Sequence, residues 1–440
     1  MLELDCGVEF ESSNPQREDE FFASLPARPA VYLIRLKSGG DPYLSRTIDL
    51  RRAAERLLRA PVELSKRLNL RELAASLHFR VTASKFEQLL TLYQQARKEL
   101  PGRYRDFLRL RRPALVKLNL RNAYPRCYAT RRISADRGLY IGPFASRHSA
   151  EFYAEKFRDL FKARRCQIKI RRDPEFPGCI YSEMKMCLAP CFGGCTTEEY
   201  SVEVARMSGA LATQGEALVQ ALEREREAAS EALDFELAAT LHKKLEKAEA
   251  SFRGFPALVR RIDELDAVVL QRGASGESVN FFVVRGGVIA DPFTLHFGAE
   301  ANLKSAEEII RGHLEVSEVA APDATGGEGA AALKVVGQSV QVGGEGDGGL
   351  EALRGKYGFV GMAAELPDHL SLLARWFYGK PRDGEIFFRE KVWPYRRMLR
   401  ACARILAPQV ARGSEGAPPG GAPGVSESPA STPEQGNLPL

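Results

Sequence analysis

Four cysteines, Cys166, Cys179, Cys187 and Cys191, fall within 26 residues and make up half of the chain's eight cysteines. The gaps between them are 12, 7 and 3 residues. Thiolates are soft ligands that suit zinc or iron–sulfur clusters, and structural zinc sites usually combine two closely spaced cysteine pairs. Only one such pair occurs among the four, with Cys195 one step further on. The unequal gaps therefore favour a [4Fe–4S] cluster, with zinc as the runner-up and unligated thiols as the third possibility.

The composition of the whole chain supports a metal rather than disulfides at these cysteines. The 440 residues are 44% hydrophobic and 27% charged, as in globular proteins of roughly two to four domains. No run of about 18 apolar residues occurs, so we expect no membrane span. The acidic N-terminus lacks the apolar segment of a secretion signal. We therefore expect a cytoplasmic protein, in a compartment that keeps thiols reduced.

A basic stretch precedes the cysteines. Between Arg103 and Arg132 the chain has ten Lys or Arg and a single acid, Asp106. Cations release counterions from DNA phosphates, and interleaved aromatics such as Tyr124 and Tyr128 can stack on exposed bases. The stretch thus predicts DNA binding without sequence readout, and a solvated helix face is the alternative. The candidate DNA-binding residues are Arg109, Arg111, Arg112, Lys117, Arg121, Arg131 and Arg132.

The elements that must position these residues belong to an α/β multidomain chain. In the first hundred residues, patterns of period two and period 3.6 predict a small α/β unit. Its strands are expected at 29–36, 43–44 and 77–82, and its helices at 47–58 and 84–98. Ser84 is a candidate N-cap for the second helix, and Glu87 would complete a capping box.

Composition divides the chain into five regions. Further strands are expected at 265–271, 279–287 and 333–342, with a helix at 369–378 and glycine-rich loops at 325–331 and 343–349. The final region has the composition of a disordered tail. The regions are an α/β unit at 1–100, the basic and cysteine-containing part at 101–200, a helical part at 201–255, a second α/β part at 256–408 and the tail at 409–440.

Residues 230–250 predict one helix of a two-helix hairpin, with 217–229 as the other. Ala232, Phe235 and Ala239 lie at helical spacing beside a stripe of leucines. Such an apolar surface is wide for a free helix and narrow for a core helix. It indicates a hairpin that docks onto another helical hairpin, and an ordinary internal coiled-coil hairpin is the alternative. The leucine stripe consists of Leu233, Leu237, Leu241 and Leu245.

Three segments resemble UvrC, the nuclease subunit of bacterial nucleotide excision repair. They are YPRCYATRRI (124–133), LYIGPFASRHSAEFYAEKFRDLFKARRC (139–166) and CIYSEMKMCLAPC (179–191). The Gly142-Pro143-Phe144 and CLAPC pieces are distinctive. The resemblance covers roughly residues 25–300 and implies that the family's four cluster-ligating cysteines fall on the four named above.

The N-terminal unit resembles a degenerate GIY-YIG nuclease domain. In that family two tyrosines, a lysine, a helix arginine and a metal-binding glutamate build the site. Tyr32 and Tyr43 match the tyrosines, and Arg46 replaces the lysine but stays protonated. The arginine and glutamate positions fall on Ala53 and Leu92. We therefore expect an inactive domain, with Mg²⁺ required only if it cuts.

The segment LDFELAATL resembles the UVR motif, through which UvrC binds UvrB. This resemblance implies that residues 230–250 contact a UvrB-type helicase subunit, with Phe235 and Glu236 as contact residues. Residues 265–297 resemble the segment leading into the RNase H-like nuclease domain of UvrC. That domain needs several Asp on strands, but Asp323, Asp347 and Asp368 are expected in or beside loops. We also recognise no helix–hairpin–helix repeats, so the part at 256–408 is expected to be a residual α/β fold.

Together the resemblance to UvrC and the basic stretch imply a UvrC-like excision-repair protein that binds DNA and a UvrB-type partner, without nuclease activity of its own. The alternative is a divergent GIY-YIG endonuclease that makes a single incision. A third hypothesis is a regulatory scaffold whose cluster senses redox state.

Overall fold

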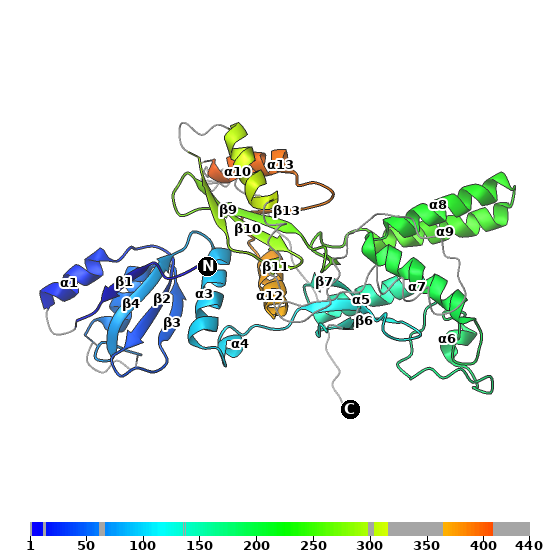
Figure 1. Cartoon of the computed structure of the whole chain (residues 1–440), viewed down its shortest axis with the longest axis horizontal. Coiled ribbons are helices and arrows are strands. Elements are labelled where there is room, and N and C mark those ends of the chain that lie inside the picture. Colours follow the sequence, from blue (N-terminus) through cyan, green and yellow to red (C-terminus); the bar gives the residue numbers. More distant parts are fainter. Residues whose placement is uncertain are drawn as a thin grey trace, which may run out of the picture. The chain divides into compact units, whose positions relative to one another are not determined.

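The computed structural model describes residues 2–11, 15–60, 67–134, 136, 138–297, 303–315 and 364–407. Within these ranges the protein is mixed α/β, with three antiparallel sheets (Figure 1). No helix in this part of the chain is long and apolar enough to cross a membrane. Several predictions lie outside the described residues, namely the strand at 333–342, both glycine-rich loops, Asp323, Asp347 and the tail at 409–440.

The N-terminal sheet has the strand order β1-β4-β2-β3. Alternate residues of a strand face opposite sides of a sheet, so β2 separates two cores. Tyr32 and Ile34 face α1 and α2, whereas Val31 and Leu33 face α3. The predicted strands and helices are all present, with β1 and α1 in addition. The elements are β1 (Cys6–Glu9), α1 (Pro15–Ser24), β2 (Ala30–Leu36), β3 (Tyr43–Thr47), α2 (Leu50–Leu58), β4 (Ala74–Val81) and α3 (Lys85–Glu99).

Only half of the predicted capping box at α3 forms. Ser84 Oγ accepts the Glu87 N–H at 3.0 Å, as expected of an N-cap. The Glu87 carboxylate, however, accepts the Ala83 N–H at 2.9 Å and a hydrogen bond from Asn280 Nδ2 at 3.2 Å. Burial raises the pKa of Glu87. This carboxyl therefore connects α3 to the C-terminal sheet.

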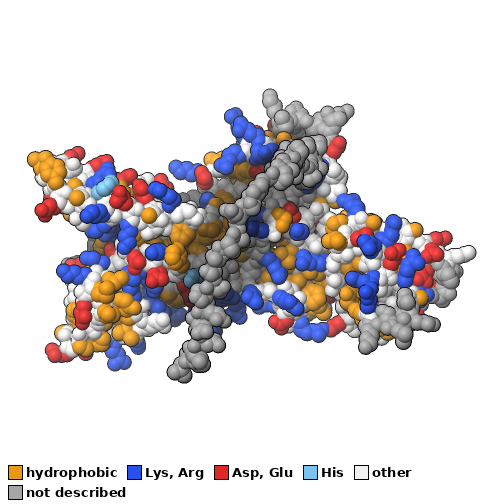
Figure 2. Space-filling view, turned by 180° about the vertical axis from the view of Figure 1, so that it is seen from behind, with side chains coloured by type: hydrophobic (Ala, Val, Ile, Leu, Met, Phe, Trp, Pro, Cys, Tyr) orange, Lys and Arg blue, Asp and Glu red, His pale blue; other side chains and the backbone are white. Residues whose placement is uncertain are grey.

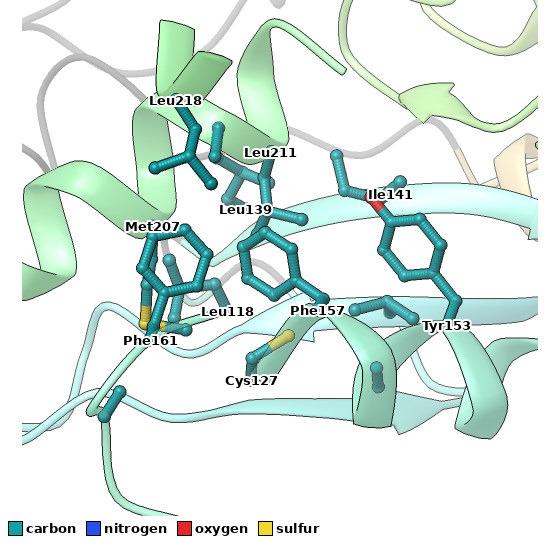
Figure 3. Close-up of a cluster of buried hydrophobic side chains, with 14 of the residues drawn as sticks. Leu118, Cys127, Leu139, Ile141, Tyr153, Phe157, Phe161, Met207, Leu211 and Leu218 are labelled. Carbon is teal, nitrogen blue, oxygen red and sulfur yellow. The ribbon is translucent and has the colours of Figure 1, made fainter. Parts of the chain in front are cut away.

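The middle sheet has the order β6-β5-β7-β8 and is covered by α5. Tyr153 and Phe157 of α5 pack in one core with Leu139 and Ile141 of β7, and α7 closes the same core (Figure 3). The elements of this part are α4 (Tyr104–Phe107), β5 (Ala114–Leu118), β6 (Cys127–Thr130), β7 (Leu139–Phe144), α5 (Arg147–Arg158), α6 (Ile180–Glu183), α7 (Thr197–Ala212) and β8 (Arg260–Arg261).

The Gly-Pro-Phe piece lies at the end of β7, where its glycine is required by close packing. Gly142 has φ of +148°. A Cβ at this position would come 2.8 Å from Leu115 Cδ2 and 3.2 Å from the Ala114 carbonyl oxygen. Any side chain would push β7 away from β5, so only glycine keeps these strands paired.

The predicted helical hairpin is formed by α8 (Glu216–Glu231) and α9 (Phe235–Phe252), which run side by side (Figure 1). Leu233 makes the turn with φ of +58°. Asp234 then caps α9, because its Oδ1 accepts the Leu237 N–H at 3.0 Å. The leucine stripe divides at this end. Leu241 and Leu245 are buried in the core of the middle part, whereas Leu233 and Leu237 are exposed.

The C-terminal sheet has the order β11-β10-β9-β13, and β12 pairs with β10. Because residues of β9 alternate, Val269 packs toward α12 and α3, and Val268 packs toward α10 and α13. The elements are β9 (Ala267–Arg272), β10 (Ser278–Arg285), β11 (Val288–Ile289), β12 (Phe293–His296), α10 (Leu303–Glu315), α12 (Leu366–Phe377), β13 (Glu385–Phe388) and α13 (Tyr395–Leu406).

The expectation that Asp368 lies beside a loop is wrong. Asp368 is buried in the first turn of α12. Its Oδ2 accepts a hydrogen bond from the Tyr104 hydroxyl at 2.7 Å, and its Oδ1 accepts one from Arg105 Nε at 3.0 Å. A buried carboxylate needs such partners, so this side chain holds α4 against α12.

Candidate nucleic-acid interface

A hollow lined by arginines lies where the segment before β5 meets the end of α12. Its volume is about 530 Å³, and neither Asp nor Glu is among its lining residues. Five arginines from three separate segments of the chain line it. We call it the arginine hollow. The arginines are Arg109, Arg111, Arg112, Arg131 and Arg375.

Two side chains of α12 hold this helix against the basic segment. Ser371 Oγ donates a hydrogen bond to the Arg111 carbonyl. Arg375 Nη1 donates to the Leu108 carbonyl at 3.3 Å. Both contacts use backbone acceptors. They therefore fix where the segment runs and leave the guanidinium groups of residues 109–112 available to the hollow.

The opposite wall comes from the junction of β7 and α5. The Tyr378 hydroxyl, which follows α12, donates to the Pro143 carbonyl at 2.9 Å. Ser146 lines the hollow and caps α5, because its Oγ accepts the Ser149 N–H at 3.1 Å. The N-terminus of a helix carries a partial positive charge. The wall thus adds to the positive potential of the arginines.

The arrangement of charge in the hollow suits an anion. Like charges at close range repel one another unless an anion lies between them. Guanidinium groups are planar forks that match two oxygens of a phosphate. Lys and Arg side chains occur on many parts of the face in Figure 2. A high local count of cations on the surface therefore does not distinguish this site, whereas the convergence of five arginines in one hollow does.

Four of the seven predicted DNA-binding residues line the arginine hollow. Arg121 and Arg132 are exposed but lie outside its lining. Arg375 was not predicted, since α12 is far along the chain from the basic stretch and no local pattern connects the two.

Lys117 corrects the prediction of a basic track. It is only 4% exposed in β5 and forms an ion pair with Asp136. Its Nζ lies 5.0 Å from the centroid of the Tyr140 ring. A DNA phosphate cannot reach a lysine buried and paired in this way. Lys117 therefore supports the middle sheet, which is why five consecutive buried residues can include a cation.

The positions that match the nuclease motif lie on both faces of the N-terminal sheet. Tyr32 pairs with Ser45, and Tyr32 and Tyr43 pack in the core below α2, with ring centroids 6.2 Å apart. Arg46 pairs with Val31, which faces α3. Directly paired residues project to the same face, so Arg46 points away from both tyrosines.

Tyr32 is also buried deeply in this core. Its side chain is 1% exposed. Burial, and then the neighbouring Tyr43 phenol, raise the pKa of Tyr32 to about 12. A general base works best with a pKa near the operating pH. Ala53 adds only a methyl group to the same core, and Leu92 of α3 is buried in the other core.

The four predicted metal ligands lie in the segment between α5 and α7. Cys179 precedes α6, and the Cys187 sulfur accepts the Ala189 N–H at 3.3 Å. Burial, together with smaller contributions from charges on Cys166, Cys179 and Cys191, raises the pKa of Cys187 to about 11.

The thiols are thus close enough to interact electrostatically. Within the described residues, however, no three His, Cys, Asp or Glu side chains are arranged to hold a metal ion. The donors fit a cluster by their chemistry, since all four are soft and one already accepts a backbone N–H. The metal centre stays a prediction.

An exposed apolar tip terminates the helical hairpin. Leu233 is 71% exposed, Phe235 66% and Leu237 47%. Glu236, the second predicted contact residue, is also exposed beside them. Large apolar side chains gathered at one exposed point are typical of an interaction surface. We call these residues the hairpin tip.

Comparison with known proteins gives one family match in the middle of the chain and several similar curated proteins. Residues 114–209 match the family model described as UvrC/Cho excinuclease, middle domain. The chain is also similar to curated proteins called UvrABC system protein C. That of Nitratidesulfovibrio vulgaris is 30% identical over 271 residues, which is 61% of this chain and 39% of the relative. That of Oleidesulfovibrio alaskensis is 28% identical over 288 residues, 65% of this chain and 41% of the relative.

A third relative, from Ruminiclostridium cellulolyticum, is 24% identical over 286 residues, 64% of this chain and 46% of its own length. The chain therefore spans about two fifths of the length of the curated relatives it matches. No solved structure matches it.

Proposed function

We propose that this UvrC-like chain is a DNA-binding component of nucleotide excision repair that makes no incision with its N-terminal unit. The arginine hollow is the observation on which the proposal rests. Five arginines from three segments converge there without a carboxylate. A folded protein tolerates such repulsion most readily at a site that an anion occupies in use.

The DNA backbone is the anion that fits best. The arginine hollow offers five positive charges and no negative one, as is typical of contacts that position a duplex rather than read its sequence. The match to the middle domain of UvrC covers Ala114 and most of the surrounding sheet. Binding would therefore be steeply dependent on salt and indifferent to sequence.

Three features of the N-terminal unit support the absence of incision there. Arg46 and Leu92 face away from Tyr32, so the motif positions do not share one site. Ala53 supplies no charge for a developing phosphorane. Leu92 offers no oxygen to a metal ion. A divergent endonuclease would need other residues in these roles.

The hairpin tip supplies the surface for a UvrB-type helicase subunit. Phe235 and its two leucine neighbours offer apolar area, and Glu236 offers a charge at the rim. Interfaces of this kind bury an aromatic anchor surrounded by polar groups. The four-cysteine segment would hold a [4Fe–4S] cluster, or zinc in its place. Either metal would cross-link the loop next to the middle sheet.

A binding experiment with charge-neutral variants tests the arginine hollow. Arg131→Gln and Arg375→Gln change side chains on different elements that meet in the hollow. Losing one charge-assisted contact to a phosphate costs about 1.5 kcal/mol, or roughly tenfold in affinity for a fluorescein-labelled duplex. Arg253→Gln, in an exposed arginine after α9, is the matched control and should leave affinity unchanged. Equal losses in all three variants would refute the proposal.

A plasmid-nicking assay with Mg²⁺ or Mn²⁺ tests the absence of incision. We expect no cleavage above the level of a buffer control. Cleavage that Tyr43→Phe abolishes would instead establish the alternative, a divergent GIY-YIG endonuclease, since only a phenol in the site could then account for it.

A further inference from the structure

A second hollow, of about 380 Å³, lies at the other end of β5, between the β5–β6 turn and the segment after Cys166. We call it the turn hollow. It has no Asp or Glu among its lining residues. Two of its cations, Arg126 and Lys169, come from different segments of the chain. The lining includes Asn119, Asn122, Tyr124, Arg126, Gln167 and Lys169.

The floor of the turn hollow is fixed by one buried arginine. Arg164 is 5% exposed. Its Nε donates to the Tyr124 carbonyl and its Nη1 to the Ile168 carbonyl, both at 2.7 Å. Its backbone N–H donates to the Tyr200 hydroxyl at 3.0 Å. The guanidinium thus joins the turn to the segment after Cys166, and the shape of the hollow does not depend on a ligand.

Most of the remaining polar groups of the lining lack hydrogen-bond partners. The exception is Asn119, whose Oδ1 accepts the Arg121 N–H at 3.2 Å, while Arg126 lies over the Tyr128 ring, 4.3 Å from its centroid. Within the described residues, the side chains of Asn122, Arg126, Gln167 and Lys169 make no hydrogen bond or ion pair. Arg126 is half-buried. Burial lowers its pKa, and the charge of Arg164 lowers it further. A half-buried guanidinium beside another one, without a carboxylate, lacks the counter-anion that burial of charge requires.

The chemistry of the turn hollow differs from that of the arginine hollow. Here two cations stand among three amide side chains, and each amide both donates and accepts hydrogen bonds. Tyr124 adds an aromatic ring, already packed edge-on against Tyr200 at 5.3 Å between centroids. A ligand that satisfies this set carries an anionic group, a hydrogen-bonding edge and a flat ring. The volume lies within the usual range for small-ligand sites.

We propose that the turn hollow binds a single nucleotide displaced from a DNA strand. The inference rests on the proposed DNA-binding function and extends it. Strand β5 separates the two hollows by five residues, or about 17 Å at the rise of a strand. One strand can therefore have its backbone in the arginine hollow and an unstacked nucleotide in the turn hollow. Taking a nucleotide out of the stack is easiest where it is unpaired.

The test compares two fluorescein-labelled duplexes that differ only by one unpaired deoxyadenosine, using fluorescence anisotropy at fixed salt. We expect the wild-type chain to prefer the duplex with the unpaired nucleotide about tenfold, the effect of one stacked or hydrogen-bonded base. Lys169→Ala and Arg126→Gln should each reduce this preference severalfold. Arg171→Ala removes an exposed charge two residues from Lys169 but outside the lining, and should leave the preference unchanged.

The outcomes separate this inference from the proposed function. Equal binding of both duplexes by the wild type, or a preference that Lys169→Ala and Arg126→Gln leave intact, would overturn the inference alone. Failure to bind either duplex would overturn the proposed function. Deoxyadenosine monophosphate distinguishes the two sources of a nucleotide. If deoxyadenosine monophosphate binds to the wild type but not to Arg126→Gln, and the two duplexes bind equally, the turn hollow takes a free nucleotide. The proposal that its ligand comes from a DNA strand is then wrong.

Discussion

Replacing Phe235 by alanine should weaken binding to a UvrB-type helicase subunit without affecting the fold. A phenylalanine buries about 200 Å² when fully covered, and 66% of this side chain is exposed in the free chain. A partner can therefore cover about 130 Å² more, worth about 3 kcal/mol at 25 cal/mol per Å². Alanine retains part of that area, so we expect a loss of about 2 kcal/mol, or roughly 30-fold in affinity.

Isothermal titration of the purified partner into the wild-type and variant chains measures this loss. Substitution of an exposed side chain changes the free energy of unfolding by less than about 0.5 kcal/mol, so thermal melts should coincide. Phe152→Ala is the matched control, because Phe152 is 50% exposed but lies on α5. If Phe235→Ala binds within twofold of the wild type, or Phe152→Ala loses as much, the hairpin tip is not the docking surface.

Three further predictions concern charge, protonation and metal. With five arginines on phosphates, the logarithm of the DNA affinity should fall with the logarithm of the salt concentration at a slope of about −4.5, so a fourfold rise in salt should weaken binding roughly 500-fold. In Arg131→Gln the same rise in salt should weaken binding only about 150-fold. An affinity that does not change with salt would contradict the proposal that the arginine hollow binds DNA. Burial lowers the pKa of His369, whose Nδ1 accepts the Ile289 N–H at 3.0 Å. The neutral form therefore stabilises the fold above pH 6.5, and this stability should decline below it, by at most about 1.4 kcal/mol per pH unit. In urea unfolding measured at several pH values, His369→Asn should reduce this loss of stability at low pH. If the variant loses as much stability as the wild type, groups other than His369 cause the loss. Anaerobically purified protein should be brown with about four irons per chain, whereas one zinc per chain would reject the cluster.

Local patterns were sufficient to predict most elements of the N-terminal unit, the hairpin and part of the C-terminal sheet, but none of the strands of the middle sheet. Period-two and period-3.6 spacing identified β2, α2, α3, β9, β10 and α12, because each buries one face against a core. The helical hairpin was predicted from its leucine stripe. The pattern could not show that Leu241 would be buried and Leu237 exposed, since that depends on where the middle part ends.

The candidate sites were predicted less completely. Arg46 and Tyr32 stand at motif positions, but the β2–β3 register places them on opposite faces. Lys117 belongs by composition to the basic stretch, yet β5 is buried on both sides and pairs it with Asp136. A strand covered on both faces has no alternation of polar residues, so its sequence does not reveal which cation is buried.

The sequence by itself determined the location of the cysteines and basic residues and the presence of the hairpin, because these depend on residue types and on spacing within one element. Tertiary structure alone decided which cations act together. Arg375 joins Arg109 and Arg131 only because Ser371 and Tyr378 hold α12 against the middle part. Convergence of side chains from distant segments depends on packing between elements, and packing leaves no periodic signal within any one of them.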